Sequence, residues 1–256
     1  MSYVGGQYHG WQSQPDGQTV QDHLERALSA FAASEQIKTL CAGRTDTGVH
    51  GLMQVVHFDT HLVREPMSWV RGTNRYLPAD ISVQWAQEVP EAFHCRASAL
   101  RRRYAYVVLE SAVRPAIESG RVGWVFMPLQ LEPMVQASQH LIGEHDFTSF
   151  RASACQADTP VKTLYDIRIS QKGAYWRFDF EGNAFLHHMI RNIMGCLLAV
   201  GQGRYSADWM AHVLSARDRD AAAPTFAAEG LYFLGPVYDA QWGLPERTAA
   251  FDWLPL

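Results

Sequence analysis

Residues 41–58 read CAGRTDTGVHGLMQVVHF, a glycine-punctuated loop that runs into an apolar segment. The loop contains three glycines, Gly43, Gly48 and Gly51. Because glycine accepts backbone conformations with positive φ, the loop can turn tightly and present Arg44, Asp46 and Thr47 together. We expect a strand to follow over 52–58. A carboxylate in such a loop suits nucleophilic or basic chemistry, although an isolated Asp46 could instead bond only its own backbone in an Asx-turn.

The composition is that of a globular protein with one large or two medium domains. The chain has 256 residues, of which 47% are hydrophobic and 19% are charged. Its formal net charge of −4 argues mildly against nucleic-acid binding, which normally leaves a basic footprint. The excess acids lie in residues 206–256, so residues 1–205 leave room for a locally basic face. Most of the cations are arginines, which suit bidentate phosphate contacts, although biased codon usage gives the same excess.

Cysteine usage and the N-terminal segment indicate a cellular compartment. The four cysteines are scattered and form no Cys-x-x-Cys pair, at Cys41, Cys95, Cys155 and Cys196. The first ten residues lack a basic segment followed by an apolar one, and no apolar run reaches the length of a membrane span. We therefore expect reduced thiols and a cytoplasmic protein.

Hydrophobic periodicity outlines the elements. Helices are predicted over 19–33, 67–76, 133–142, 187–200 and 207–216. Strands are predicted over 52–58, 81–89, 102–109, 164–170 and 175–180. Strands and helices interleave without strict βαβ alternation, so we predict the α+β class, with a mixed or antiparallel sheet that carries helices. An irregular stretch at 91–99 predicts a boundary between an N-terminal domain, 1–95, and a C-terminal domain, 96–256.

The predicted strand at 102–109 begins with a basic group beside aromatic residues. Arg101, Arg102 and Arg103 run directly into Tyr104, and strand alternation places Tyr104 and Tyr106 on one face. Cations beside an aromatic ring can hold an unstacked nucleotide. Alternating aromatic residues are, however, more often plain core.

The segment NAFLHHMIRNIMGCLLAVG at 183–201 is apolar on most sides, which predicts a deeply buried helix that nevertheless carries Arg191. A buried arginine needs an anionic partner, and Asp46 is one candidate beside another acid or a phosphate. An ion pair with Asp46 would keep that carboxylate charged and oriented for attack. His187 and His188 predict no metal site, because adjacent helical residues point in different directions and no third ligand is suitably spaced.

Six ordered motifs resemble one family. The stretch AGRTDTGVH at 42–50 resembles the catalytic loop of the TruA family of tRNA pseudouridine synthases, and the similarity extends over nearly the whole chain. The other motifs are Gly10-Trp11-Gln12, Arg102-Arg103-Tyr104, Asp146-Phe147-Thr148-Ser149-Phe150, His187-His188-Met189-Ile190-Arg191-Asn192 and Glu229-Gly230-Leu231.

This resemblance implies the pseudouridine synthase fold, with two similar α+β halves and a central cleft. It implies isomerisation of uridine to pseudouridine at positions 38 to 40 of the tRNA anticodon arm, with no cofactor and no metal. Asp46 would be the nucleophile, attacking either the uracil ring or the ribose anomeric carbon. Tyr104 would stack on the target base and accept the proton lost at the new carbon linkage. Arg191 would pair with Asp46.

The resemblance also implies how RNA is held. Arg44 would enter the RNA stem and fill the space left by the flipped base, which offsets an unstacking cost of a few kcal/mol. Arg102 and Arg103 are further candidate substrate contacts. The family implies a homodimer that binds tRNA across both subunits.

Two positions depart from the family pattern. The family usually has Tyr-Asp-Gly at the end of its first strand, where this chain has Tyr3-Val4-Gly5 close to its first residue. A shortened first strand predicts unpaired backbone groups on its neighbour. Asp158 stands where the family tends to have a neutral or basic residue, which predicts a weaker local RNA contact.

Two other functions compete with this hypothesis. Asp46-Thr47-Gly48 is also the signature of aspartic proteases, but these need two aspartates that share a proton, and the chain has one such triplet. Single-motif proteases are short and all-β, unlike this helix-containing sequence. An RNA-binding protein that has lost catalysis through its shortened first strand is the other alternative.

Overall fold

The computed structural model describes residues 1–33 and 36–245. Among these residues, the contacts form two compact units: Met1–Leu100 with the segment from Tyr232 onward, and Arg101–Leu231. The last strand therefore groups with the N-terminal residues, whereas the predicted domain 96–256 placed it in the second half. Residues 246–256 of that predicted domain lie outside the described chain. The division into domains 1–95 and 96–256 stays a prediction, because compactness alone does not show independent folding.

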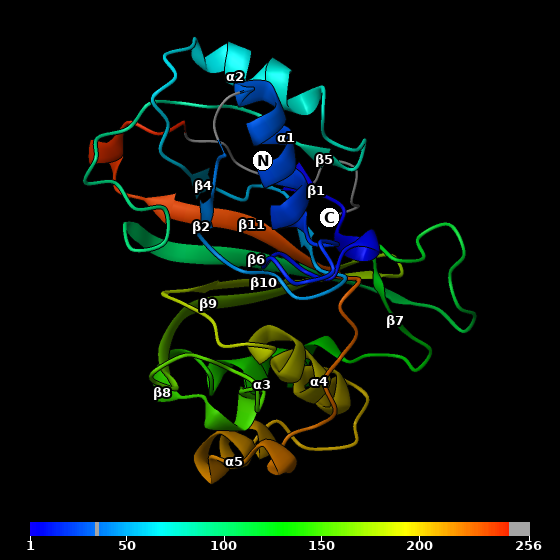
Figure 1. Cartoon of the computed structure of the whole chain (residues 1–256). Helices are drawn as coiled ribbons and strands as arrows, with labels where there is room; N and C mark the ends of the chain where they lie inside the picture. The colour runs from blue at the N-terminus through cyan, green and yellow to red at the C-terminus, as the bar shows by residue number, and fades with distance from the viewer. Residues whose placement is uncertain (34–35, 246–256) are drawn as a thin grey trace. The chain divides into compact units, whose positions relative to one another are not determined.

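The first unit is built from several two-residue strands, one longer strand and two longer helices (Figure 1). Its strands are β1 (Ser2–Tyr3), β2 (Leu40–Cys41), β3 (His50–Gly51), β4 (Val56–His57), β5 (Ile81–Ser82) and β11 (Leu231–Tyr238). Its longer helices are α1 (Val20–Ala32) and α2 (Pro66–Asn74), and single turns lie at Gly5–Gln7 and Ala240–Trp242. Four strands follow the order β5-β1-β3-β11, in which β3 and β11 are parallel and the other pairs antiparallel. A separate antiparallel pair joins β2 to β4.

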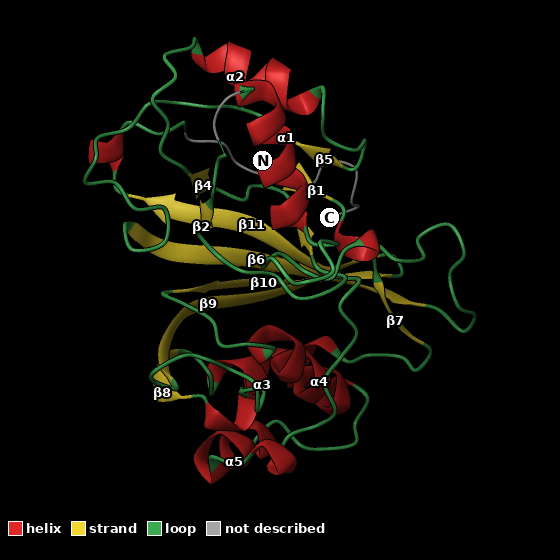
Figure 2. Cartoon of the chain, in the orientation of Figure 1, coloured by secondary structure: helices red, strands yellow, loops and turns green. Residues whose placement is uncertain are grey.

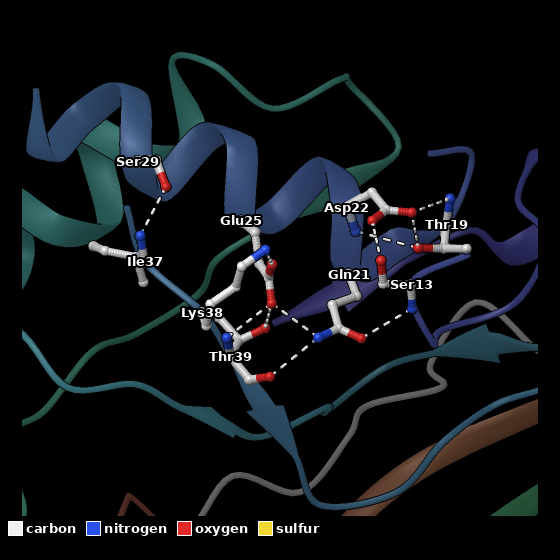
Figure 3. Close-up of polar contacts among 9 residues, drawn as sticks. All are labelled: Ser13, Thr19, Gln21, Asp22, Glu25, Ser29, Ile37, Lys38 and Thr39. Carbon is white, nitrogen blue, oxygen red and sulfur yellow. Dashed lines mark hydrogen bonds and ion pairs between the residues drawn. The ribbon is translucent and has the colours of Figure 1, made fainter. Parts of the chain in front are cut away.

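Helix α1 begins where the sequence predicts. The hydroxyl of Thr19 accepts the Asp22 backbone N–H at 3.2 Å, and the Asp22 carboxylate accepts the Thr19 backbone N–H at 3.3 Å (Figure 3). This reciprocal capping box satisfies two backbone donors that a helix start otherwise leaves open. The helix buries Leu24 and Leu28, and Phe31 packs edge-to-face on Trp69 of α2 with ring centroids 5.2 Å apart.

A buried carboxylate ties α1 to the segment that leads into β2. One oxygen of Glu25 accepts hydrogen bonds from the Thr39 backbone N–H at 2.8 Å and from the Gln21 side chain at 2.8 Å (Figure 3). The other oxygen accepts from Lys38 at 2.9 Å. Burial raises the pKa of Glu25, but the bonds from Thr39, Gln21 and Lys38 together outweigh burial, so this pKa lies below its ordinary value. Glu25 thus holds the chain directly before the Asp46 loop.

Two predicted strands of the first unit are interrupted. The prediction over 52–58 was wrong in its continuity, because the segment changes its partner strand from β11 at β3 to β2 at β4. The backbone N–H of Leu52 donates to Phe233 at 2.9 Å, while that of Ala42 donates to Val55 at 2.9 Å. Of the strand predicted over 81–89, only β5 forms. The Asn74 side chain bonds the backbone N–H and carbonyl of Val83, so these groups are not available to a partner strand.

Strand β1 pairs with a neighbour on each side. Tyr3 of β1 is in register with Gly51 of β3 and Ile81 of β5. Before it, the Met1 amino group donates to the Gln54 carbonyl at 2.7 Å, and the Gln54 backbone N–H donates to the Met1 carbonyl at 2.9 Å. The expected unpaired backbone groups are therefore not found at Gln54.

The second unit has long strands. They are β6 (Ala99–Glu110), β7 (Gly123–Val125), β8 (Gly143–Asp146), β9 (Val161–Lys172) and β10 (Tyr175–Gly182). The order β6-β10-β9-β8 is antiparallel throughout, and β7 joins β6 in parallel. Parallel pairs thus occur in both units among mainly antiparallel ones, which confirms the α+β class and the mixed or antiparallel sheet.

Helices cover one side of β9 and β10 in this unit (Figure 2). They are α3 (Leu131–Gln139) and α4 (Met189–Gly201). Helix α5 (Trp209–Ala216) packs against α3 farther from these strands, and single turns lie at Thr148–Phe150 and Arg219–Ala221. Strand β10 alternates fully buried Trp176, Phe178 and Phe180 with half-buried polar residues. The strands predicted over 102–109, 164–170 and 175–180 are confirmed as β6, β9 and β10.

The five predicted helices exist, with ends that shift by up to three residues. Helix α4 begins at Met189 because His188 takes a left-handed backbone conformation with φ of 62°. None of the described helices combines the length and the apolarity needed to cross a membrane.

Candidate active site

The loop between β2 and β3 carries Asp46. Arg44 and Thr47 are exposed, Thr45 is buried and Asp46 is half-buried. The backbone on both sides of Asp46 is held, because the Trp11 N–H donates to the Thr45 carbonyl at 3.0 Å and the Val49 N–H donates to the Asp46 carbonyl at 3.1 Å. The loop therefore presents one carboxylate from a fixed backbone, as the sequence predicts.

Gly10 lets an N-terminal turn approach this loop closely. Its φ is +81°, and a Cβ atom there would lie 2.9 Å from the Thr45 carbonyl oxygen and 3.2 Å from the Asp46 carbonyl carbon. A side chain at this position is therefore excluded by both space and backbone conformation. The motif at Gly10 was visible in the sequence, but its contact with the Asp46 loop was not.

Two further side chains anchor the ends of the loop. The Gln54 amide donates to the Gly43 carbonyl at 2.6 Å and accepts the Gly43 backbone N–H at 3.4 Å. After the loop, the His50 ring accepts the Gly5 backbone N–H through Nδ1 at 3.1 Å and stacks on Tyr232 at 4.6 Å. Sequence reasoning missed these supports, because only the folded chain brings the partners together.

In the second unit, Tyr104 lies on β6 and is buried, with 8% of its surface exposed. It is in register with Phe180 and packs edge-to-face on Phe185, with centroids 5.0 Å apart. The neighbouring Tyr106 is fully buried and donates its hydroxyl to the Ala227 carbonyl at 2.6 Å. The two tyrosines therefore share a strand face.

The three arginines before Tyr104 differ in their contacts. Arg101 pairs with Glu181 at 2.5 Å, and Arg102 donates to the Asn183 carbonyl at 2.7 Å. The Nε atom of Arg103 is buried and has no hydrogen-bond partner within the described chain. A buried donor without a partner costs about 1–3 kcal/mol, and a hydrogen-bond acceptor that reached Arg103 Nε would remove this cost.

Arg191 lies in the first turn of α4 and is half-buried, not deeply buried as the sequence predicted. Two hydrogen bonds join it to Phe226: the Arg191 Nε donates to the Phe226 carbonyl at 2.9 Å, and the Phe226 backbone N–H donates to the Arg191 carbonyl at 3.1 Å. The next residue, Asn192, is fully buried and accepts the Thr225 hydroxyl at 2.6 Å. Sequence reasoning missed both Phe226 and Thr225. The predicted pairing of Arg191 with Asp46 joins residues of different units and stays a prediction.

One cluster in the first unit has the residue types of a metal site. Candidate ligand atoms of His57, His94 and Cys95 lie within 4.8 Å of one another. However, His57 Nδ1 accepts the Cys95 N–H at 3.1 Å, and His94 Nδ1 accepts the Arg96 N–H at 3.1 Å. A neutral ring that accepts through Nδ1 carries its proton on Nε2, which blocks coordination there. Burial and the neighbouring His94 lower the pKa of His57, which favours this neutral form, and the Cys95 thiol donates to Leu40. These bonds make the cluster a structural support.

Comparison with known proteins identifies the family to which the chain is similar. A family model described as tRNA pseudouridine synthase matches residues 1–96 and 137–239. The chain is 66% identical over 273 residues to "tRNA pseudouridine synthase A" of Paracidovorax citrulli, which covers 100% of this chain and 98% of that protein. It is 67% identical over 259 residues to the protein of the same name from Polaromonas naphthalenivorans, with the same coverage.

A chain in the crystal structure of a Cbf5-Nop10-Gar1 complex aligns with this one over 92% of this chain and 57% of that chain, at 11% identity and a TM-score of 0.37. The family model covers well over half of the chain, and the two relatives match its whole length, including the Asp46 loop. The chain therefore belongs to the tRNA pseudouridine synthase family.

Proposed function

We propose that this protein isomerises uridine to pseudouridine at positions 38 to 40 of the tRNA anticodon arm. Its family membership supports the isomerase activity and tRNA as the substrate. The observation that carries the proposal is the Asp46 loop, where a half-buried carboxylate stands on a backbone held at both flanks.

The chemistry requires few groups. The bond from N1 of uracil to the ribose breaks, a bond from C5 to the same ribose carbon forms, N1 gains a proton and C5 loses one. The product is an isomer of the substrate, so the reaction needs a nucleophile and a proton acceptor but no oxidant or reductant. Asp46 is the nucleophile, adding either to the uracil ring or to the ribose carbon. Tyr104 stacks on the target base and accepts the C5 proton.

The arginines have two roles in this proposal: one pairs with the nucleophile, and the others contact the RNA. Arg191 pairs with Asp46 and orients the carboxylate. The bonds with Phe226 hold the backbone carbonyl and the Nε of Arg191 in place. Arg44 is exposed two residues before Asp46 and enters the RNA stem in place of the flipped base. Arg103 offers a buried Nε to a substrate oxygen, and Arg102 lies beside it on the strand.

The anticodon arm as the binding site, the homodimer and the cytoplasmic location are parts of the same proposal. The family resemblance supports the first two. The four free cysteines fit the reducing environment of the cytoplasm. No cofactor or metal enters the proposed reaction.

The experiment is incubation of the purified protein with an unmodified tRNA transcript, followed by chemical mapping of pseudouridine at single-nucleotide resolution. We expect pseudouridine at one or more of positions 38, 39 and 40. Pseudouridine only at other positions would overturn the proposed site on tRNA. Tight tRNA binding without any pseudouridine would instead support the RNA-binding alternative.

A further inference from the structure

Thr45 directly precedes Asp46 and is held from two sides. Its carbonyl accepts the Trp11 backbone N–H at 3.0 Å. Its hydroxyl shares a hydrogen bond of 2.8 Å with the hydroxyl of Tyr3, which belongs to β1 and lies 42 residues earlier in the chain. Thr45 is 7% exposed and Tyr3 is 3% exposed, so this bond is shielded from water. A buried hydroxyl that loses its partner has no solvent to replace it.

The Tyr3 ring has little freedom to move. It is in register with Gly51, where an added Cβ would lie 2.5 Å from two of the ring carbons. On another side the Trp11 ring packs against it, with centroids 5.8 Å apart. Tyr3 and Trp11 therefore form one rigid support, and each bonds a different atom of Thr45.

The protonation state of Tyr3 suits a permanent hydrogen bond. Burial raises its pKa far above the ordinary tyrosine value, more than the bonds from Thr45 and Gln54 lower it. The hydroxyl therefore keeps its proton throughout the physiological range and acts as a neutral partner. Gln54 extends the support, because its amide bonds both backbone groups of Gly43 at the start of the loop.

We propose that Tyr3 is a positioning residue for the isomerisation, which acts through Thr45 to hold the Asp46 carboxylate where the target uridine reacts. This inference rests on the proposed function. Tyr3 exchanges no proton with the substrate in this account. A displacement of a reacting group by about 1 Å can cost about 10²-fold in rate, so loss of one buried bond beside the nucleophile should lower the chemical step.

The test compares hydroxyl deletions in the full-length protein. Tyr3→Phe and Thr45→Val each remove one partner, while Thr45→Ser keeps the hydroxyl. We expect Tyr3→Phe to lower kcat by about 10- to 100-fold with little change in KM, and Thr45→Ser to retain most of the rate. Because both deletions break the same bond, the double variant should be scarcely slower than the slower single variant.

A matched control separates positioning from stability. Tyr8 is also buried in the first unit and donates its hydroxyl to Asp80, so Tyr8→Phe removes a comparable phenol bond elsewhere. We expect Tyr8→Phe and Tyr3→Phe to lower the unfolding midpoint similarly, but only Tyr3→Phe to lower kcat. Far-ultraviolet circular dichroism and tRNA binding identify any variant that fails to fold.

The outcomes are distinct for the two proposals. An inactive wild-type protein overturns the proposed function itself. An active wild type with unchanged kcat in Tyr3→Phe and Thr45→Val overturns only the role of Tyr3. Equal losses of kcat in Tyr3→Phe and Tyr8→Phe, or fully additive losses in the double variant, also contradict it. If Tyr3→Phe misfolds, the kcat of Thr45→Val relative to Thr45→Ser decides the question.

Discussion

The two units carry their candidate site residues in opposite ways. In the first, Asp46 lies on a loop whose flanking strands are two residues long, and side chains or distant backbone groups replace regular strand partners. In the second, Tyr104 lies within a twelve-residue strand and Arg191 within a thirteen-residue helix. The first unit thus holds its functional residue by a few specific contacts, and the second by many equivalent backbone bonds.

This difference predicts different sensitivity to substitution. Removing one contact of the Asp46 loop leaves few others to keep the backbone in place. Removing one side-chain contact of β6 leaves the backbone ladder with β10 intact. Substitutions away from the reacting groups should therefore affect catalysis more in the first unit than in the second.

The largest effect is expected at the proposed nucleophile. Asp46→Asn should lower the single-turnover rate of pseudouridine formation by about 10³-fold or more, because an amide is neutral and does not attack. The change in stability should be small, since Asp46 is half-buried and its flanking backbone is held independently. Asp59→Asn, at an exposed aspartate of the same unit, is the control and should leave the rate unchanged. Equal rates for wild type and Asp46→Asn would remove Asp46 from the chemistry.

The next effect compares two tyrosines on one strand face. Tyr104→Phe should retain tRNA binding but lower the single-turnover rate by about 10²-fold, because it removes the proposed proton acceptor. Tyr106→Phe loses the bond to Ala227 and should cost about 1–2 kcal/mol of stability without lowering the rate. Rates from rapid quench and denaturant unfolding of both variants check this contrast. A slower Tyr106→Phe with a normal Tyr104→Phe would reverse the assignment.

A third prediction compares glycines of the two units. Gly10→Ala places a Cβ 2.9 Å from the Thr45 carbonyl oxygen at a positive φ, and should cost about 2–3 kcal/mol while lowering activity. Gly173 has φ of +59° in the turn between β9 and β10, with no atom near an added Cβ. Gly173→Ala should cost only about 1 kcal/mol and leave activity unchanged. Similar activities for the two variants would show that the Asp46 loop tolerates displacement.

The smallest effect concerns pH. The pKa of Glu25 is lowered on folding, so its stabilising contribution is complete above the ordinary carboxyl value of about 4.3 and is lost as pH falls through the lower folded-state value. Glu25→Gln should therefore cost about 1 kcal/mol at neutral pH and less at acidic pH. Urea midpoints measured from neutral to acidic pH check this, with the exposed Glu144→Gln as control. A difference from wild type that stays constant with pH would contradict it.

The comparison of units also explains what sequence reasoning could predict. Strands β6, β9 and β10 contain many β-branched and aromatic residues over eight to twelve positions, so their composition indicates strands without knowledge of the fold. A strand of two residues has no period, which is why β2 and β3 were missed and why the predicted strand 52–58 was too continuous. Strand β11 was also missed.

In the candidate site, too, local motifs could be predicted from the sequence and long-range contacts could not. The motif around Asp46 identified the loop, and the family resemblance assigned roles to Tyr104 and Arg191 that remain proposals. The supports at Tyr3, Gln54 and Phe226 were not predicted, because each acts on residues at least eleven positions away. No local pattern indicates such long-range pairings.

The most direct test of the account uses the hydrogen that pseudouridine formation must release from C5. The purified protein is incubated with two unmodified tRNA transcripts labelled with tritium at C5 of uridine, one with uridine at positions 38 to 40 and one with cytidine there. We predict release of tritium to water from the first transcript, at no more than one per target uridine, and background release from the second. Equal release from both transcripts, or none from either, would contradict the account.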